Sequence, residues 1–307
     1  MPIKRLDDII EHVKTLPRKK VVVAFAQEEF TIRAVKQAIE LNIADMVLIG
    51  DEIIIKDICS RNNIDHNIFE IIHEVEDLPA ARKAISMINN GEADILMKGL
   101  ISTDRLLKCI LDKENGLAIP GATLSHVSVA EIPRYRKLLI FSDAAFIPRP
   151  DIDQKIAMTN YVIDAARKLG IPRPRVALIS FSEKASPKIK EPVDCLIISK
   201  MGEQGLIKYG DIDGPLAMDL AIDPVSVRIK GVKSCVHGDA DCLVFPFLEA
   251  GNVFFKTLTL FAQTEIATCI YGTKAPVVIS SRADSSQSKL YSLALNCLLA
   301  SGINYNG

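Results

Sequence analysis

The sequence predicts an α/β protein made of two domains, each with a mostly parallel sheet. Short runs rich in β-branched residues recur along the 307-residue chain, and stretches with the periodicity of amphipathic helices separate them. Six prolines also gather between residues 148 and 192, and such a cluster favours a domain boundary near residues 142–150.

The expected strands are short and almost continuously apolar, which is typical of parallel strands covered by helices on both faces. None is long enough to span a membrane, so no membrane association is expected. In chain order they are 21–26, 46–49, 68–72, 95–97, 138–141, 176–180, 195–198, 242–245 and 277–280.

Helices are expected where apolar residues recur every three or four positions. Ser102 and Thr103 stand directly before one such pattern and are typical N-cap residues. Gly302 follows the last pattern and suits a helix C-terminus. The patterns cover residues 32–39, 106–111, 156–169 and 290–298.

Composition excludes several classes of protein. The 37 Lys and Arg residues balance 38 Asp and Glu, so a bulk electrostatic grip on nucleic acid is not expected. The motifs GxGxxG, GxxxxGK[ST] and GxSxG are missing, which disfavours a Rossmann dehydrogenase, a P-loop enzyme and an α/β-hydrolase. The five histidines have no metal-binding spacing, so no metal site is predicted.

Cysteine usage and the first residues favour a cytoplasmic protein. The seven cysteines stand singly, mostly in apolar segments, which indicates reduced and buried thiols. Residues 1–20 carry charges throughout and contain no apolar run, so we do not expect them to be a signal peptide.

Candidate binding residues follow the predicted strands, because ligands of parallel α/β sheets bind at the carboxyl ends of the strands. Lys98 follows strand 95–97, and Ser102 and Thr103 begin the next helix. An ammonium, two hydroxyls and free helix amides can form an anion site, although an ordinary capped loop would use the same residues.

Two further strand ends carry candidates. Ser281 and Arg282 follow strand 277–280, and a guanidinium suits phosphate oxygens, although a solvated surface arginine is the alternative. Gly251 and Asn252 are expected to open an apolar helix whose free amides face the same kind of edge, or simply to cap it.

Taken together, the motifs resemble the phosphate acetyl/butyryltransferase family, and within it the butyryl branch. The resemblance runs over nearly the whole chain. It comprises VVVAFAQEE (21–29), LMKGLIST (96–103), LSHVSV (124–129), SDAAF (142–146), SKMGEQGLIKYGDIDGPLAMDLA (199–221), EAGNVFFKTLT (249–259) and APVVISSRADSSQSKL (275–290).

The resemblance implies the reversible reaction acyl-CoA + phosphate ⇌ acyl phosphate + CoA, with butyryl or another short acyl chain. It implies an isocitrate dehydrogenase-like architecture with a cleft between two domains, which we place at residues 1–141 plus 285–307 and at residues 142–284. It further implies a homodimer or higher homo-oligomer, CoA as co-substrate and no permanently bound cofactor. A phosphate acetyltransferase, and a non-catalytic protein that binds CoA or acyl phosphate, remain the alternatives.

By the same resemblance, residues from both domains would serve the reaction. Arg282 would hold phosphate oxygens and Ser281 the thiolate or reacting carbonyl. Lys98, Ser102 and Thr103 would complete a phosphate pocket, while Gly251 and Asn252 would bound the cleft. Asp284 is the candidate base, with capping of the following helix as its alternative role, since the acetyl branch has a carboxylate where this chain has Ser288.

Three positions depart from the family pattern. Phe247 stands where a polar residue is usual, Asp239 replaces a lysine, and Ile147 replaces a small polar residue. These changes make the expected cleft more apolar or alter its contacts with CoA, so they bear on which acyl chain is preferred.

Overall fold

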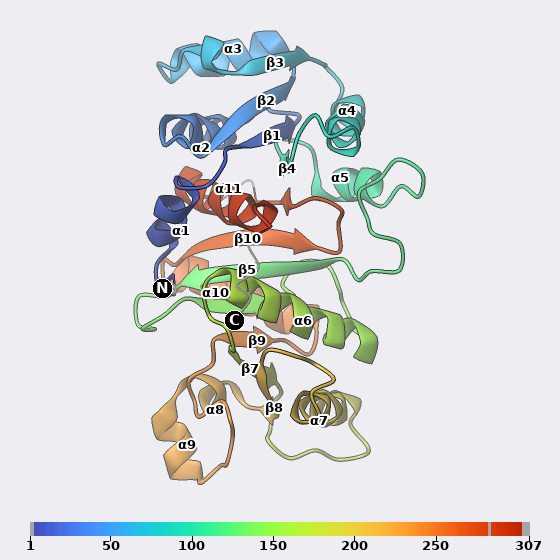
Figure 1. Ribbon diagram of the computed structural model, residues 1–307, viewed down its shortest axis with the longest axis vertical. Coiled ribbons are helices and arrows are strands. Elements are labelled where there is room, and N and C mark those ends of the chain that lie inside the picture. Colours follow the sequence, from blue (N-terminus) through green and yellow to red (C-terminus); the bar gives the residue numbers. More distant parts are fainter. Residues whose placement is uncertain (1–2, 282–283, 303–307) are drawn as a thin grey trace. The chain divides into compact units, whose positions relative to one another are not determined.

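The structure, a computed structural model, describes residues 3–281 and 284–302. Its described residues divide into two compact units (Figure 1). The terminal unit comprises residues 6–124 and 266–302, and the central unit comprises residues 3–5 and 125–265. Each unit contains mostly parallel strands with helices around them, so the predicted α/β class is confirmed.

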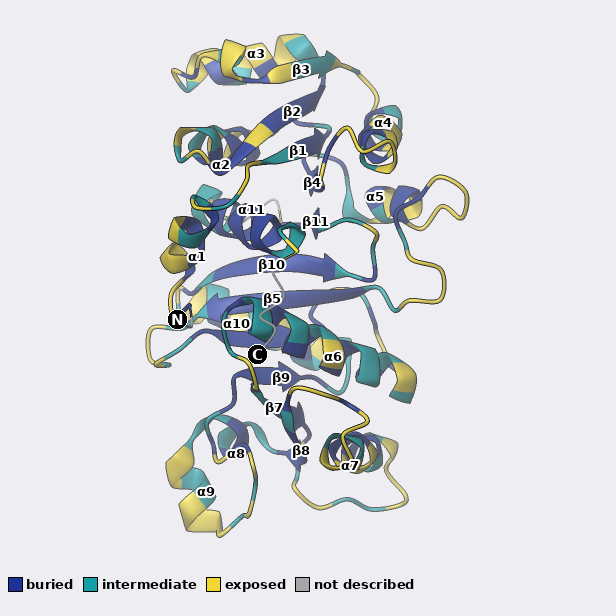
Figure 2. Ribbon diagram, viewed as in Figure 1, coloured by how far each residue is buried: buried dark blue, intermediate teal, exposed yellow. Residues whose placement is uncertain are grey.

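The sheet of the terminal unit is mainly parallel. Its strand order is β3 (Glu70–His73), β2 (Ala44–Gly50), β1 (Lys19–Ala24), β4 (Ile95–Lys98), β11 (Val277–Val278) and β10 (Glu265–Tyr271). The first five strands run parallel, and β10 pairs antiparallel with β11. The strands are largely buried, as the dark blue arrows of Figure 2 show.

Helices cover both faces of this sheet (Figure 1). On one side, α11 (Ser286–Ala300) packs against α1 (Leu6–Val13) and α2 (Glu29–Glu40). On the other side, α4 (Asp77–Asn89) packs against α5 (Thr103–Ile110). The helix α3 (Glu52–Arg61) and a 3₁₀ turn, η1 (His66–Ile68), lie between β2 and β3 in the chain.

The sheet of the central unit has the strand order β5 (Ser125–Glu131), β6 (Leu139–Ser142), β9 (Cys242–Val244), β7 (Arg175–Ile179) and β8 (Asp211–Leu216). Only the β5–β6 pair is antiparallel among these described strands. Its helices are α6 (Ile152–Lys168), α7 (Lys190–Glu203), α8 (Met218–Ile222), α9 (Pro224–Lys230) and α10 (Leu248–Phe261).

The predicted strand 195–198 is wrong, because these residues lie inside α7. Cys195 and Ile198 are buried, whereas Leu196 and Ile197 between them are exposed. This alternation is that of a helix with one buried side, and a four-residue apolar run cannot distinguish it from a strand.

Strands β5, β8 and β10 were not predicted. In β5 the buried positions include Ser125, His126 and Ser128, so its sequence does not read as an apolar run. In β8, Gly214 and Pro215 interrupt the β-branched pattern. Both strands are stabilised by tertiary contacts that local sequence does not reveal.

Along the chain, the boundaries between the observed units fall at residues 124/125 and 265/266, whereas the predicted boundaries were 141/142 and 284/285. The last helix, α11, lies in the unit that contains the first strands, as in the predicted grouping. The predicted domains, as parts that fold independently, stay a prediction.

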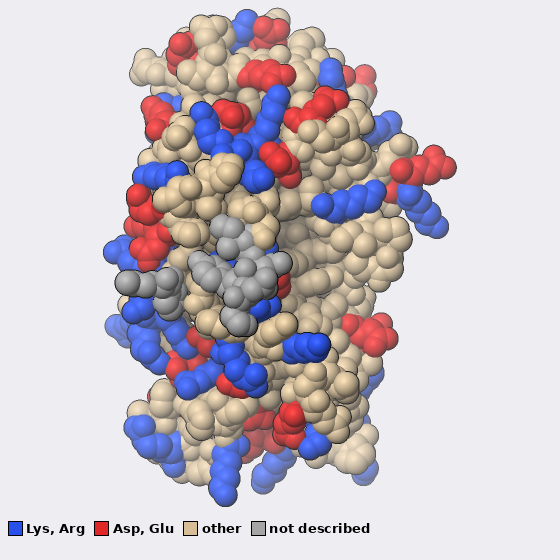
Figure 3. All heavy atoms as spheres, viewed as in Figure 1, with Lys and Arg blue, Asp and Glu red and all other residues tan. Residues whose placement is uncertain are grey.

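Within the described chain, no helix is both long and apolar enough to cross a membrane. Lys, Arg, Asp and Glu side chains mix over the visible surface in Figure 3, in keeping with a formal net charge of −1. A local anion site must therefore be built from particular residues.

Candidate active site

The carboxyl ends of β1, β4 and β11 lie along one edge of the terminal sheet because the three strands are parallel neighbours. Lys98 is the last residue of β4 and is only 4% exposed. Its Nζ donates to the carbonyl oxygen of Gly99 at 3.2 Å. The predicted strand end thus places an ammonium group in the interior of this edge.

Gly99 brings the loop after β4 against the end of β1. A Cβ atom at this position would lie 2.2 Å from the carbonyl oxygen of Phe25, which leaves room for glycine alone. The amides of Gly99 and Leu100 donate to Ala24 and Phe25, which fixes the loop.

The helix start predicted at Ser102 and Thr103 is confirmed. Thr103 is the first residue of α5, and the Ser102 hydroxyl, at the N-cap, accepts from the amide of Arg105 at 3.4 Å. The Ser102 hydroxyl therefore serves as a helix cap, and its role in binding phosphate stays a prediction.

Ser281 and Asp284 close a turn after β11. The Ser281 amide donates to Oδ2 of Asp284 at 2.7 Å, and the Asp284 amide donates to the Ser281 carbonyl oxygen at 3.2 Å. Asp284 is not the helix cap, because Ser285 caps α11 through its hydroxyl, which accepts from the Ser288 amide at 3.0 Å. Arg282 lies outside the described residues.

Lys289 is a buried cation that we did not predict as a site residue. It is 2% exposed, and its Nζ donates to the Ser281 carbonyl oxygen at 2.8 Å and to the Ser280 hydroxyl at 3.2 Å. Oε2 of Glu28 lies 3.7 Å away. Burial lowers the pKa of Lys289 from its usual 10.5, while the charges of Glu28 and Asp284 oppose that shift.

Sequence offered one signal for Lys289. It begins the run 289–298 of α11, which is buried throughout and otherwise contains no charged residue. A lysine at a buried helical position needs a partner, and this one holds the turn that carries Ser281.

In the central unit, Asp143 organises the loop after β6. The residue is 2% exposed, and its carboxylate accepts four hydrogen bonds from described residues. The donors are the Ser125 hydroxyl and the backbone amides of His126, Ala145 and Phe146. Sequence reasoning noted this strand end but gave Asp143 no role, and the bonds show that the carboxylate fixes the loop.

The expectation that Gly251 opens a helix is wrong, because α10 begins at Leu248. Phe247 is the N-cap residue, so Gly251 is the fourth residue of α10 and lies within its first turn. A Cβ atom on Gly251 would lie 2.0 Å from the carbonyl oxygen of Asp143, so the residue permits close contact between helix and loop. Its amide donates to Phe247 at 3.4 Å and is used within the helix.

Asn252 also connects α10 with the loop after β6. Its Nδ2 donates to the Ala144 carbonyl oxygen at 3.0 Å. Phe254 and Phe255 follow it and pack edge to face against Phe141 of β6. The structure therefore shows these side chains in packing contacts, and a role of Asn252 in the reaction stays a prediction.

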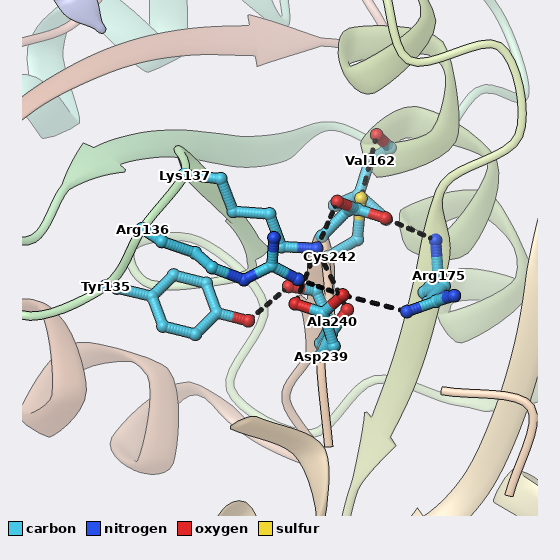
Figure 4. A network of polar contacts seen from close by, with 9 residues as sticks. Tyr135, Arg136, Lys137, Val162, Arg175, Asp239, Ala240 and Cys242 are labelled. Atoms are coloured by element: carbon cyan, nitrogen blue, oxygen red, sulfur yellow. Dashed lines mark hydrogen bonds and ion pairs between the residues drawn. The ribbon is translucent and has the colours of Figure 1, made fainter. Parts of the chain in front are cut away.

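Asp239, the predicted departure from a lysine, has cationic neighbours (Figure 4). Its carboxylate pairs with Arg136 at 2.6 Å, with Lys137 at 3.2 Å and with Arg175 at 2.8 Å. Lys137 also pairs with Asp241 at 2.5 Å. The negative charge of Asp239 is thus balanced by three neighbouring cations, which explains why an acidic residue is tolerated at this position. The third departure, Ile147, is buried.

All seven cysteines are free, and six are buried as predicted, whereas Cys235 is exposed. Burial raises the pKa of the Cys195 and Cys297 thiols to about 12. These thiols stay protonated at neutral pH and are poor nucleophiles. Among residues 3–281 and 284–302, no three His, Cys, Asp or Glu side chains are grouped to hold a metal ion.

Comparison with known proteins identifies the family. Residues 5–80 and 78–297 match the family described as phosphate acetyl/butaryl transferase. The chain is 41% identical to a phosphate butyryltransferase of Clostridium acetobutylicum over 97% of this chain and 99% of that protein. It is 37% identical to a phosphate acetyltransferase of Thermotoga maritima over 92% and 95% of the two chains.

A solved structure shows the same relationship in three dimensions. A branched-chain phosphotransacylase from Enterococcus faecalis superposes with a TM-score of 0.79 at 30% identity, over 91% of this chain and 99% of that one. The residues that match the family model include the strand ends described above, α10 and residues 286–297 of α11. The chain therefore belongs to the phosphate acetyl/butyryl transferase family.

Proposed function

We propose that this protein catalyses the reversible transfer of a short acyl group between CoA and inorganic phosphate. The observation that carries the proposal is the 41% identity with a phosphate butyryltransferase over 97% of the chain. In the forward direction the phosphate oxygen attacks the thioester carbonyl, and the CoA thiolate leaves. In reverse, the thiolate attacks the acyl phosphate and phosphate leaves.

We assign the binding of phosphate to the carboxyl edge of the terminal sheet. Lys98, Ser102 and Thr103 supply an ammonium and two hydroxyls at that edge. Arg282 supplies a guanidinium, which can hold two oxygens of phosphate or acyl phosphate. Donors fixed before the reaction stabilise negative charge as it develops on the carbonyl and phosphate oxygens.

Ser281 is proposed to hydrogen-bond the thiolate or the reacting carbonyl. Support comes from Lys289 and Asp284, which hold the Ser281 carbonyl oxygen and amide, respectively, at 2.8 and 2.7 Å. We name Lys289 a positioning residue, because it acts through Ser281. Asp284 is the proposed base for the CoA thiol, although its Oδ2 also accepts from the Ser281 amide.

The central unit is proposed to contribute Asn252 and the helix turn at Gly251. Both contact the loop fixed by Asp143, so their backbone has a defined position. A fixed position matters because orientation alone lowers the barrier by up to about 7–11 kcal/mol in well-oriented reactions.

The preferred acyl group is proposed to be butyryl or a similar short chain, branched chains included. Identity is higher to the butyryltransferase, at 41%, than to the acetyltransferase, at 37%, and the similar solved structure is of a branched-chain phosphotransacylase. Acetyl-CoA is the second candidate substrate, because the acetyltransferase match also covers 92% of the chain.

We further propose that CoA acts only as co-substrate, with no permanent cofactor, and that the enzyme is a homodimer or higher homo-oligomer. The end of α10 exposes Leu260 and Phe261, which a second copy of the chain could cover. The free cysteines support a cytoplasmic location.

The test is a phosphate-dependent assay of thiol release from acetyl-, propionyl-, butyryl- and branched acyl-CoA. We expect turnover with the four-carbon chains and a lower kcat/KM with acetyl-CoA. Tight binding of CoA without turnover of any thioester would support a non-catalytic protein instead. A preference for acetyl-CoA would assign the chain to the acetyl branch.

A further inference from the structure

A cavity of about 330 Å³ lies in the central unit, at the start of α10. It is lined by Arg149, Ser180, Phe181, Glu191, Pro246 and Phe247. Ser180 directly follows β7, and Pro246 comes two residues after β9. Since β7 and β9 are parallel neighbours, the cavity lies at the carboxyl edge of the central sheet, where α/β proteins bind ligands.

Ser180 gives this cavity one buried polar atom. The residue is 7% exposed, and its Oγ has no hydrogen-bond partner among the described residues. Its amide is paired with the Leu216 carbonyl oxygen at 2.8 Å, so the backbone is fixed while the hydroxyl is left over. Buried hydroxyls are nearly always paired, which makes Ser180 a donor for a bound molecule.

Phe247 makes one wall apolar at the position where the family pattern has a polar residue. The Arg149 guanidinium lies 4.9 Å from the centre of its ring, and Arg149 is itself paired with Glu249 at 2.6 Å. These contacts hold the ring in place. Phe181 and Pro246 add further apolar surface to the lining.

We propose that this cavity receives the acyl group of acyl-CoA, and that the Ser180 hydroxyl donates to the carbonyl oxygen of that group. The proposal rests on the proposed function and specifies its substrate. An acyl thioester offers one carbonyl acceptor and an aliphatic tail, which match one buried hydroxyl and an apolar wall. The other polar side chains of the lining are Arg149, which is paired with Glu249, and Glu191.

Chain-length preference follows from the wall. A tail of four carbons leaves water by contacting Phe247, whereas an acetyl group is too short to gain as much from the same contact. With asparagine at 247 the longer tail would lie against an amide, so the advantage of butyryl over acetyl should shrink.

The first experiment compares Phe247→Asn with the wild type. We expect the ratio of kcat/KM for butyryl-CoA to that for acetyl-CoA to fall roughly tenfold, as for loss of a methylene-sized apolar contact. Phe247→Leu keeps an apolar wall and should retain most of the ratio. The control is Ile229→Asn, an exchange of an apolar side chain for the same amide at a residue of α9 that is 80% exposed, and it should leave the ratio unchanged.

The second experiment examines Ser180→Ala. Acetyl and butyryl groups both carry the carbonyl oxygen, so kcat/KM should fall about tenfold for each and their ratio should stay constant. Free CoA has no acyl group, and its dissociation constant, measured by calorimetry, should be unchanged in both Ser180→Ala and Phe247→Asn.

Two results would overturn the proposal. A weaker affinity for free CoA with an unchanged acyl ratio would assign the cavity to another part of CoA. An unchanged ratio and affinity would show that no part of the substrate occupies it. If the wild type turns over no thioester, the proposed function fails, but the cavity proposal can still be tested. The dissociation constants of butyryl-CoA and free CoA then report whether Phe247→Asn weakens the binding of the acyl group.

Discussion

Lys289 places an ammonium inside the terminal unit, and burial lowers its pKa from 10.5. The unfolded chain therefore holds this proton at pH values where the folded chain has released it. Between the lowered pKa and 10.5, the free energy of unfolding should rise with pH, and the destabilising cost of burying the charge is fully present below the lowered pKa.

Replacing Lys289 by methionine removes this dependence. We expect the free energy of unfolding of Lys289→Met, measured with urea at a series of pH values, to rise less toward pH 10.5 than that of the wild type. Lys56→Met changes an exposed lysine of α3 and serves as the control. Parallel curves for Lys289→Met and the wild type would contradict a lowered pKa.

Arg282 should contribute to the reaction and little to stability. Arg282→Ala removes the charge that we propose binds phosphate, and loss of one such donor typically lowers kcat by about 10²–10³-fold. The midpoint of urea unfolding should be unchanged. Arg61→Ala, at an exposed position of α3, is the matched control, and equal kinetics in both variants would refute the assigned role.

Asp239 is required by the cations around it, although the family pattern has a lysine there. Asp239→Lys would place a fourth cation beside Arg136, Lys137 and Arg175. We expect the free energy of unfolding to fall by about 3 kcal/mol, as when a buried ion pair loses one partner. Asp239→Asn removes the attraction to the cations without adding a repulsive charge, so it should lower the free energy of unfolding by less than Asp239→Lys. Equal losses in the two variants would argue against repulsion.

At the scale of elements, the position of α10 depends on Gly251. Gly251→Ala would bring a Cβ atom to 2.0 Å from the Asp143 carbonyl oxygen, which is backbone and cannot turn away. We expect the free energy of unfolding to fall by about 1–3 kcal/mol, as in overpacked sites, and kcat to fall because the helix shifts. Thr257→Ala changes an exposed residue of α10 and should lower neither the free energy of unfolding nor kcat. Unchanged thermal unfolding of Gly251→Ala would contradict the close contact.

Sequence predicted the elements whose local pattern agrees with their burial. Residues 32–39, 106–111, 156–169 and 290–298 all lie within or at the end of helices, and the cap at Ser102 is where a serine before a periodic stretch predicts it. The run 195–198 misled because four apolar residues fit one helical turn as well as a strand.

The candidate site was predictable only in part, for a physical reason. Strand ends and cap residues are local signals, so sequence could place Lys98, Ser102 and Ser281 at such ends, while their roles in the reaction stay a prediction. The roles of Asp143 and Lys289 come from partners distant in sequence, such as Ser125 and Glu28. Which of these partners meet is decided by tertiary packing, which no motif states.

At the scale of the whole molecule, the terminal unit needs its last helix. Leu290, Leu293 and Leu298 of α11 are buried, and burial of each stabilises by about 1.5–3 kcal/mol. Their sum is comparable with the whole stability of a domain, about 5–15 kcal/mol. In a chain that ends at residue 280, the remaining part of the terminal unit should therefore not fold.

Limited proteolysis followed by mass spectrometry measures this loss. In the shortened chain, we expect rapid cleavage within residues 6–124 and survival of a fragment that covers 125–265. The full chain under the same conditions is the control. Equal resistance of residues 6–124 in both chains would show that the terminal unit is stable without α11.

The terminal unit is assembled from two stretches of chain, with residues 125–265 of the central unit between them, and this order has a consequence for synthesis. On the ribosome, the first stretch emerges early but lacks β11 and α11, so apolar surface that these elements later cover stays open while the central unit is translated. The continuous central stretch can close first, against the usual order in which N-terminal domains lead. We expect the nascent chain to be prone to aggregation in that interval, and a premature stop codon near its end would leave the terminal unit incomplete.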